Sequence, residues 1–314
     1  MSLTADLERG VVRFGTLTVG AGPVVVIGGA GADARWINLR ENHGRVLASE
    51  SVAAVRAGWR GPVLVEPFSA ADLPEIAANA VGAVVGAAWM QDFQLVRAVA
   101  RLGLPVLVQR APSATLEEWL AVADYCVAEG NDRVVLCESG SRTHLGGVTL
   151  DLALMRAARE RSGRPVLADL GGDPGLAAAA IAAGADGLLL PPGSTEREAL
   201  AVHEAVKIVG AVTRREDPGS LPAARGAIDR VDAALALLLE RRAELAGVIQ
   251  RLKPVGGFAG RDMDRERRLV ADMARRAPGL GEDRLASIMN AVIEAGLHLA
   301  EERMAADRGR ARAE

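Results

Sequence analysis

The sequence contains few aromatic residues, few cysteines and almost no lysine. Only 3% of its 314 residues are aromatic, and of its 37 basic residues all but Lys207 and Lys253 are arginine. The two cysteines, Cys126 and Cys137, are too few for a disulfide framework or a cysteine-based zinc site. Because half of the residues are apolar, we expect a core built mainly from alanine, valine and leucine.

The sequence also has no large excess of charge of one sign and no long apolar run. The 37 basic and 40 acidic residues leave a net charge of −3, and no basic block offers an electrostatic footprint for nucleic acid. No apolar run approaches the roughly 18 residues that a membrane span needs. The segment Met1–Gly10 carries charge and lacks the apolar core of a secretion signal. We therefore expect a cytoplasmic protein without nucleic-acid or membrane partners.

Short apolar runs rich in valine and leucine recur through the first 190 residues, with helical stretches such as 115–129 and 175–183 between them. Near-continuous apolar runs are typical of strands that are covered on both faces. Alternating strands and helices predict a parallel α/β fold, either a barrel or a doubly wound sheet. Seven clear strands favour a (β/α)8-like TIM barrel with one shortened or missing element. The seven runs begin at Pro23, Pro62, Ala83, Pro105, Arg133, Pro165 and Gly187.

The pattern changes after Val212. The stretch 213–221 is polar and broken by Pro and Gly, which is typical of a linker. The apolar residues that follow are spaced alternately by four and three, which predicts one helix from about Pro222 to Lys253, ended by Pro254 and by the glycines at 256 and 257. Two further helices are expected at 261–276 and 282–306. The predicted division is a barrel in 1–212, a linker in 213–221, an all-α three-helix domain in 222–306 and a flexible tail in 307–314.

Charged residues gather at particular places in the helical domain. Asp262, Arg265 and Glu266 are spaced i, i+3 and i+4, so they share one helix face. Arg242 occupies the one position of the regularly spaced apolar row in 222–253 that is not apolar. Lys253 follows three turns later on the same face. Arg225 lies about 42 Å before Lys253 along the helix, so a small ligand that touches both must take Arg225 from a second chain. A run of this kind is also typical of a solvated, salt-bridged helix face.

This pattern resembles the AroQ class of all-helical chorismate mutases over about Leu221 to Met304. The resemblance rests on R-x-x-I-D-x-x-D at 225–232, E-R-R at 240–242, Lys253 and R-D-x-D-R-E at 261–266. It implies a homodimer with intertwined long helices that converts chorismate to prephenate without a cofactor or a metal. The implied catalytic residues are Lys253, Arg242 and Glu266, and the implied substrate-binding residues are Arg225, Arg242, Asp262, Arg265 and Glu266.

The resemblance also implies a role for each of these residues. Arg225 from the partner chain and Arg242 bind the two carboxylates of chorismate with help from Arg265. Lys253 donates to the ether oxygen, and Glu266 binds the ring hydroxyl with the backbone near Asp262. Such a [3,3] rearrangement needs a dianion held in a folded shape and cations aimed at the charge that grows on the ether oxygen. The nearly complete preference for arginine elsewhere supports Lys253 as a position where a compact donor is needed.

One position departs from the family's pattern. The family places Gln or Glu on the last helix as a second donor to the ether oxygen, and the register of V-I-E-A-G-L-H-L places Ala300 there. Two alternatives to a mutase therefore stay open. In the first, the chain is a non-catalytic regulatory protein, which either senses chorismate or prephenate or partners an active synthase. In the second, it catalyses an altered reaction on a chorismate-like dianion.

The first domain resembles the type I-beta DAHP (3-deoxy-7-phosphoheptulonate) synthases in the stretches 109–120, 129–143 and 183–190. That family condenses phosphoenolpyruvate with erythrose 4-phosphate at a divalent metal in a (β/α)8 barrel, and it is known fused to chorismate mutase. The resemblance therefore implies a bifunctional fusion. The four scattered histidines have no ligand spacing, so we expect no other metal site.

The positions that carry the synthase chemistry are changed. The family's metal ligands correspond to Gly31, Gly172, Pro191 and approximately Val202, whose side chains cannot coordinate a cation. An expected arginine is replaced by Ala88, an expected lysine by Gln109, and the short stretch between Gly31 and Gly61 predicts a shortened or lost second strand. Of the expected residues, Arg110, Glu138, Arg142 and Thr143 remain. We expect a degenerate barrel that is inactive as a DAHP synthase and serves as a scaffold or regulatory part.

Overall fold

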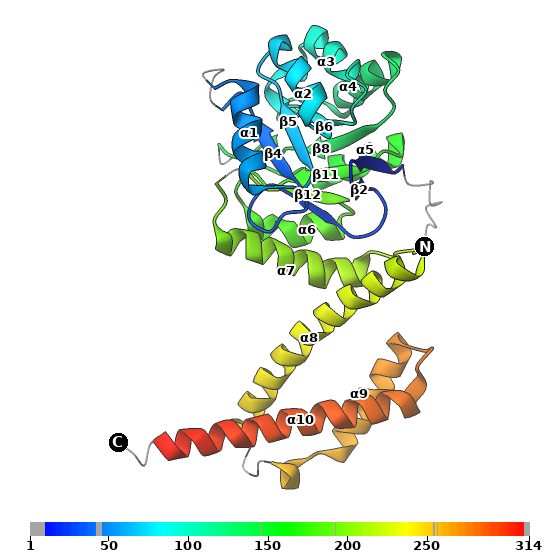
Figure 1. Cartoon of the computed structure of the whole chain (residues 1–314). Helices are drawn as coiled ribbons and strands as arrows, with labels where there is room; N and C mark the ends of the chain where they lie inside the picture. The colour runs from blue at the N-terminus through cyan, green and yellow to red at the C-terminus, as the bar shows by residue number, and fades with distance from the viewer. Residues whose placement is uncertain are drawn as a thin grey trace. The chain divides into compact units, whose positions relative to one another are not determined.

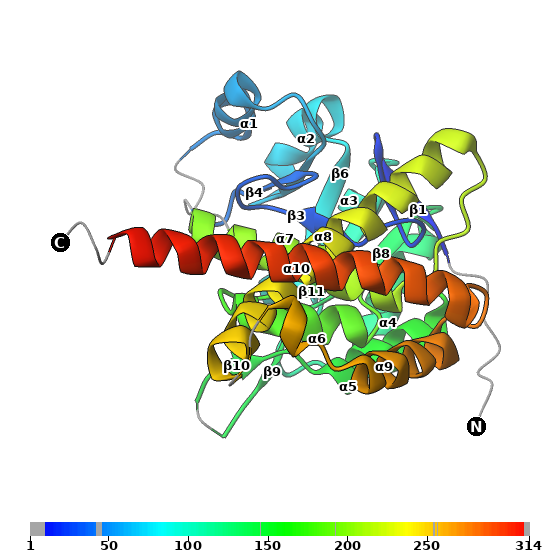
Figure 2. The same cartoon turned by 90° about the horizontal axis from the view of Figure 1, so that it is seen from below.

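The computed structural model describes residues 10–41, 46–144, 146–191, 193–253, 255 and 257–310. Its two compact units meet between Val231 and Asp232, inside one long helix, and each unit is described by itself (Figures 1 and 2). Within the described ranges, no helix is both long enough and apolar enough to span a membrane.

The first unit is built on eight parallel strands in the order β3-β12-β11-β8-β7-β6-β5-β4. The two end strands of this order are joined by a parallel bridge between Ile27 and Ala34, so the sheet closes almost completely into a barrel, as predicted. The strands are β3 (Val25–Ile27), β4 (Arg35–Asn38), β5 (Val63–Glu66), β6 (Gly82–Val85), β7 (Val106–Gln109), β8 (Val134–Glu138), β11 (Val166–Asp169) and β12 (Gly187–Leu189).

Helices surround the barrel on its outer face (Figure 1). They bury an outer apolar layer formed by every second strand residue, for example Val63, Val65, Val106 and Val108. The predicted helical stretches 115–129 and 175–183 correspond to α4 and to η3 with α6. The helices are α1 (Ala48–Gly58), η1 (Ala70–Asp72), α2 (Leu73–Asn79), η2 (Ala87–Trp89), α3 (Phe93–Ala100), α4 (Leu116–Ala128), α5 (Leu152–Ser162), η3 (Pro174–Leu176), α6 (Ala177–Ala182) and α7 (Glu196–Thr213).

The prediction of a lost second strand is wrong, because β4 is present and pairs with β5 in parallel. The element that is missing is the helix between β3 and β4: residues 28–34 connect them without one, and a crossover with a helix needs about a dozen residues or more. The strand escaped notice because its sequence, R-W-I-N, is not an apolar run.

The barrel interior is closed at one end by a hairpin that the sequence pattern did not indicate. Strands β1 (Val12–Phe14) and β2 (Leu17–Val19) pair antiparallel and pack with the inward-facing strand residues. Phe14 is fully buried, and a β-carbon at Gly82, the first residue of β6, would lie 2.3 Å from its ring. The hairpin therefore fills the amino-terminal end, which leaves the carboxyl ends of the strands as the open end where barrel enzymes place their sites. A second short hairpin, β9 (Ser141–Arg142) and β10 (Val148–Thr149), follows β8.

The three predicted helices of the second domain are present as α8 (Leu221–Leu252), α9 (Met263–Arg276) and α10 (Gly281–Arg310). Helix α9 begins after Asp262, whose carboxylate caps it by accepting from the backbone N–H of Arg265 at 2.9 Å. Helix α10 continues to Arg310, beyond the predicted end at 306. Pro254, Gly256 and the end of the predicted tail, 311–314, lie outside the described residues.

Candidate functional site

A cavity in the helical unit brings together five of the six residues predicted for the mutase site. It lies between α8, α9 and α10, and Arg225 is not part of its wall. Its volume is about 90 Å³, below the roughly 300 Å³ of an ordinary ligand pocket, so a bound ring compound would require its long side chains to move apart. It is lined by Arg242, Ala246, Ile249, Gln250, Lys253, Gly257, Gly260, Arg261, Asp262, Arg265, Glu266, Leu269, Ile293 and Leu297.

Lys253 follows the last residue of α8 and is held by the loop that returns to it. Its Nζ donates to the carbonyl of Gly260 at 2.6 Å, and the backbone N–H of Gly257 donates to the side chain of Gln250 at 2.8 Å. An ammonium group has three donors, so two remain for a ligand. Lys253 has no carboxylate partner in the part of the chain that the structure describes.

Asp262 and Arg265 lie at the start of α9. Asp262, Arg265 and Glu266 line one cavity, and Asp262 is the N-cap residue of the helix. The hydrogen bond from the backbone of Arg265, with the nearby charges of Arg268 and Lys253, lowers the pKa of Asp262. Its carboxylate is engaged with the backbone, which leaves the guanidinium of Arg265 facing the cavity without a carboxylate partner in the described chain.

Arg242 lies halfway along α8 and reaches toward α10. Its Nη1 donates to the carbonyl of Val292 at a long 3.4 Å. Burial and the like charge of Arg265 lower its pKa, and the opposite charge of Glu266 acts the other way. Two guanidinium groups without a carboxylate partner in the described chain therefore line one cavity, and their mutual repulsion is relieved by an anion bound between them.

Glu266 is paired with Arg261, to which the sequence analysis gave no role. The Nε and Nη2 of Arg261 donate to the two carboxylate oxygens of Glu266 at 3.1 and 2.6 Å. Arg261 also donates to Asn290 at 2.8 Å and to Glu294 at 3.4 Å, both on α10. Its place in the R-D-x-D-R-E motif was the available signal, but the motif alone does not say which arginine pairs with the glutamate.

Ala300 is buried and is not part of the cavity wall. It follows Ile293 and Leu297, which do line the cavity, at the i, i+4, i+7 spacing of one helix face. The neighbouring Glu301 lies close to Gly257, a residue of the cavity wall: a β-carbon on Gly257 would lie 2.7 Å from its Oε1.

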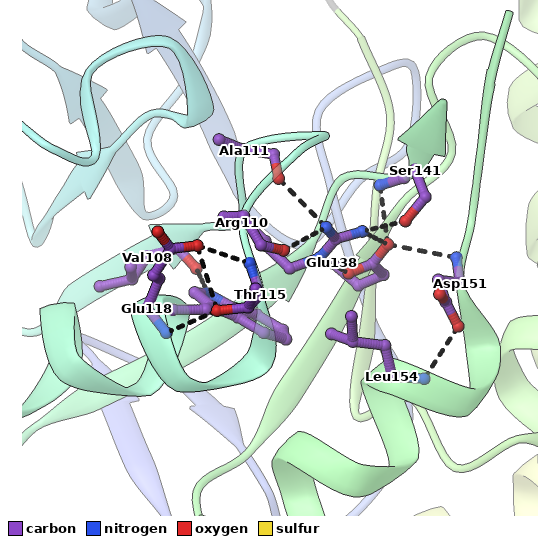
Figure 3. A network of polar contacts seen from close by, with 12 residues as sticks. Val108, Arg110, Ala111, Thr115, Glu118, Glu138, Ser141, Asp151 and Leu154 are labelled. Carbon is purple, nitrogen blue, oxygen red and sulfur yellow. Dashed lines mark hydrogen bonds and ion pairs between the residues drawn. The ribbon is translucent and has the colours of Figure 1, made fainter. Parts of the chain in front are cut away.

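In the barrel, the retained Arg110 and Glu138 form a buried pair, drawn in Figure 3. Their side chains are 1% and 0% exposed, and two N–O distances of 2.6 Å join them. Arg110 also donates to the carbonyls of Ala111 and Ala114 and to the hydroxyl of Ser141. All five N–H groups of the guanidinium are used, so none is left for a phosphate.

The open end of the barrel carries buried acids. Burial raises the pKa of Glu66 to about 7, although Trp89 donates to its carboxylate at 2.9 Å and Arg40 lies 4.0 Å away. Burial raises the pKa of Asp169 to about 6, against a hydrogen bond from the backbone of Gly171. Gln109, at the position of the expected lysine, donates to Asp169 at 3.1 Å. This end therefore carries two acids with raised pKa values and an amide, with Arg40 beside Glu66.

The positions where the resemblance places the synthase family's metal ligands, Gly31, Gly172, Pro191 and approximately Val202, have side chains that do not fit a metal. Glycine and valine side chains offer no ligand atom, and Val202 is fully buried in the outer apolar layer. Among the described residues no group of three or more His, Cys, Asp or Glu side chains has the arrangement of a metal site. Of the other retained residues, Arg142 is exposed on β9 and Thr143 donates to the carbonyl of Gly147.

Comparison with known proteins agrees with this division of the chain. The family model of the DAHP synthetase I family matches residues 48–205, half of the chain. The chain belongs to this family. The family model of chorismate mutase type II matches residues 224–301, which contain every residue of the helical cavity. This member of the DAHP synthetase I family is therefore a fusion with a chorismate mutase type II region.

Individual relatives resemble the barrel. A phospho-2-dehydro-3-deoxyheptonate aldolase of Thermotoga maritima is 34% identical over 137 residues, which are 41% of this chain and 40% of the relative. A crystal structure of the DAHP synthase of Thermotoga maritima matches with a TM-score of 0.53 and 25% identity, over 59% of this chain and 64% of that one. A truncated form of the Thermotoga maritima synthase matches with a TM-score of 0.57 over 68% of this chain and 96% of that one. At 23% identity, this second structure shows the fold alone.

This chain spans 40% of the length of the curated relative that it matches.

Proposed function

We propose that the chain is a chorismate mutase, with its mutase domain in residues 222–306 and a barrel in 1–212 that is inactive as a DAHP synthase. The observation that carries this proposal is the charge of the helical cavity. Arg242, Arg265 and Lys253 line it without carboxylate partners in the described chain, while its one ligand-facing glutamate is already neutralised by Arg261. The surplus of positive charge fits a dianion.

Each residue then has a role that its chemistry suits. The planar forks of Arg242 and Arg265 bind carboxylates. Lys253 offers a compact donor for the ether oxygen, where negative charge grows as the bond breaks. Glu266 keeps free lone pairs on its carboxylate for the ring hydroxyl. The rearrangement forms and breaks bonds within one molecule, so holding the substrate folded and stabilising the ether oxygen is sufficient catalysis.

Arg225 enters this site from a partner chain in the proposed homodimer. Helix α8 exposes a row of large apolar residues at heptad spacing, which a second copy of the helix would bury. In the helical unit these include Leu235, Leu238, Leu245 and Leu252, between 49% and 79% exposed. A two-fold symmetric pairing of α8 with its copy supplies an apolar partner and a second Arg225 together.

The barrel serves as a scaffold or regulatory part in this proposal. Three observations support its inactivity as a synthase: the metal positions lack ligand atoms, Arg110 has no donor left, and the open end is acidic. An assay with phosphoenolpyruvate, erythrose 4-phosphate and Mn²⁺ tests it, and formation of the seven-carbon product by the purified chain would overturn it.

The mutase is tested by following chorismate loss and prephenate appearance with the full chain. We expect turnover in the wild type and a loss of at least about a hundredfold in Arg242→Ala, since a partly buried charge partner is removed from the substrate. The matched control is Arg241→Ala, which removes the neighbouring exposed arginine that pairs with Glu244. Tight chorismate binding without turnover would instead indicate a sensor, and pyruvate release from isochorismate would indicate an altered reaction.

A further inference from the structure

Arg261 occupies a central place among the charged groups of the helical cavity. Its guanidinium reaches both oxygens of Glu266 on α9 and also Asn290 and Glu294 on α10. Asn290 in turn donates to Glu294 at 3.0 Å. The guanidinium is 16% exposed and Glu266 18% exposed, so the pair is shielded from water at the edge of the cavity and its geometry is fixed from two helices.

Glu266 has other cations within its electrostatic reach. Its charge acts on Arg242, and Arg265 is its neighbour at the start of α9. Both guanidinium groups line the same cavity as Glu266. A carboxylate that is free to rotate would pair with either of them, because an Arg–carboxylate pair is a strong bidentate interaction. Such a pair would compete directly with an incoming carboxylate.

We propose that Arg261 is a positioning residue that holds Glu266 away from Arg242 and Arg265, so that these two arginines stay available for the carboxylates of the substrate. The inference rests on the proposed mutase function. Arg261 touches no reacting atom: it fixes the direction of the Glu266 carboxylate and neutralises its charge. Asn290 and Glu294 hold Arg261 itself, which explains why a third arginine in the cavity does not act as an anion site.

Substitution of Arg261 therefore has a consequence that a merely structural residue would not produce. In Arg261→Ala the freed carboxylate of Glu266 turns to Arg242 or Arg265 and the KM for chorismate rises about tenfold, the size expected for losing one charged hydrogen bond. In the double variant Arg261→Ala with Glu266→Gln the competing charge is gone, so its KM lies below that of Arg261→Ala. Arg261→Lys, which keeps the charge but not the fork, has an intermediate KM.

The experiment is steady-state kinetics on the full chain, with thermal unfolding of each variant as a check on folding. An unchanged KM in Arg261→Ala, or a KM in the double variant that equals or exceeds that of the single variant, overturns the inference. Should Arg261→Ala fail to fold, the same comparison of Arg261→Lys with and without Glu266→Gln decides. The control is Arg275→Ala, which removes an exposed pair with Asp272 at the other end of α9. Absence of turnover in the wild type refutes the proposed function itself and is seen before any variant is compared.

Discussion

The guanidinium of Arg110 and the carboxylate of Glu138 form a bidentate pair in the barrel with no exposure of the carboxylate to solvent. Glu138 accepts two further bonds, from the backbone N–H groups of Gly140 and Asp151. The pair therefore ties β7, β8 and the start of α5 together (Figure 3). A residue pair that resembles part of an anion site has become, in this chain, a fully satisfied structural unit.

Removing one partner of this pair should destabilise the barrel strongly. Arg110→Ala leaves the buried charge of Glu138 uncompensated, which costs about 3–5 kcal/mol. The loss in the free energy of unfolding is measured by denaturant unfolding followed by tryptophan fluorescence, because all four tryptophans lie in the barrel. The control is Arg97→Ala, whose half-exposed side chain pairs with Glu129, a carboxylate that keeps Arg101 as a second partner, so a much smaller effect is expected. Equal effects of the two substitutions would show that Arg110 is not structural.

The stability of the barrel should fall as the pH rises from about 4.5 to about 7. Folding raises the pKa of Glu66 from 4.5 to about 7, so in this window the folded state holds a proton that the unfolded state has released. The free energy of unfolding therefore decreases with rising pH, by about 3 kcal/mol for Glu66, and Asp169, with its pKa raised to about 6, adds in the same direction.

Glu66→Gln should remove the share of this pH dependence that comes from Glu66, which dominates above about pH 6, because the amide oxygen can still accept from Trp89 and no proton is exchanged. Unfolding in urea at several pH values between 4.5 and 8, again followed by tryptophan fluorescence, gives the slope. Glu75→Gln is the control, since that side chain is only partly buried on α2 and its hydrogen bond with Asn79 is exposed to solvent. A slope in Glu66→Gln as steep as in the wild type would contradict the assignment.

The sequence predicted the strands and helices whose pattern is strong and missed those whose pattern is mixed. Seven barrel strands are continuous apolar runs, and α8 follows a heptad, so both were visible. Strand β4 carries Arg35 and Asn38, and it is a strand because it pairs with β5, a tertiary effect that local composition does not encode. The resemblance to the AroQ mutases implied one site for Arg242, Lys253 and Glu266, and one cavity contains all three. The partner of Glu266 could not be predicted, because Arg261, Arg265 and Arg242 all have the chemistry for it and only the packing of α9 on α10 selects Arg261.

Lys253 should not be replaceable by arginine. Lys253→Arg places a wide planar group where a compact donor stands beside Gly260, and the loss of a well-placed donor to the ether oxygen lowers kcat by about a hundredfold. Because this contact strengthens only in the transition state, kcat and kcat/KM should fall together. The chain offers a matched control in its other lysine: Lys207→Arg, on the exposed side of α7, should leave both constants unchanged. Full activity of the Lys253→Arg variant would contradict the role of Lys253 as a compact donor to the ether oxygen.

Ala300→Gln should raise kcat. A longer side chain on this face of α10 extends back toward the preceding turn, where Leu297 lines the cavity, and an added donor to the ether oxygen is worth about a tenfold rate increase. Ala295→Gln, at an exposed position of the same helix, is the control for a general effect of glutamine on α10. An unchanged or lower kcat in Ala300→Gln would mean that this side chain does not face the ether oxygen.

Mixing two inactive variants should restore activity if Arg225 crosses between chains. In the proposed two-fold symmetric dimer, each site takes Arg225 from one chain and Lys253 from the other. A hybrid of Arg225→Ala with Lys253→Ala therefore has one site with both substitutions and one with neither. Equal amounts of the two variants, unfolded and refolded together, give roughly half hybrids and so roughly a quarter of the wild-type rate.

The control is a mixture of Lys253→Ala with Arg242→Ala. These two residues lie in the same cavity of one chain, so no hybrid of the two variants contains an intact site. Recovery in the first mixture alone establishes the crossing, and recovery in neither contradicts it.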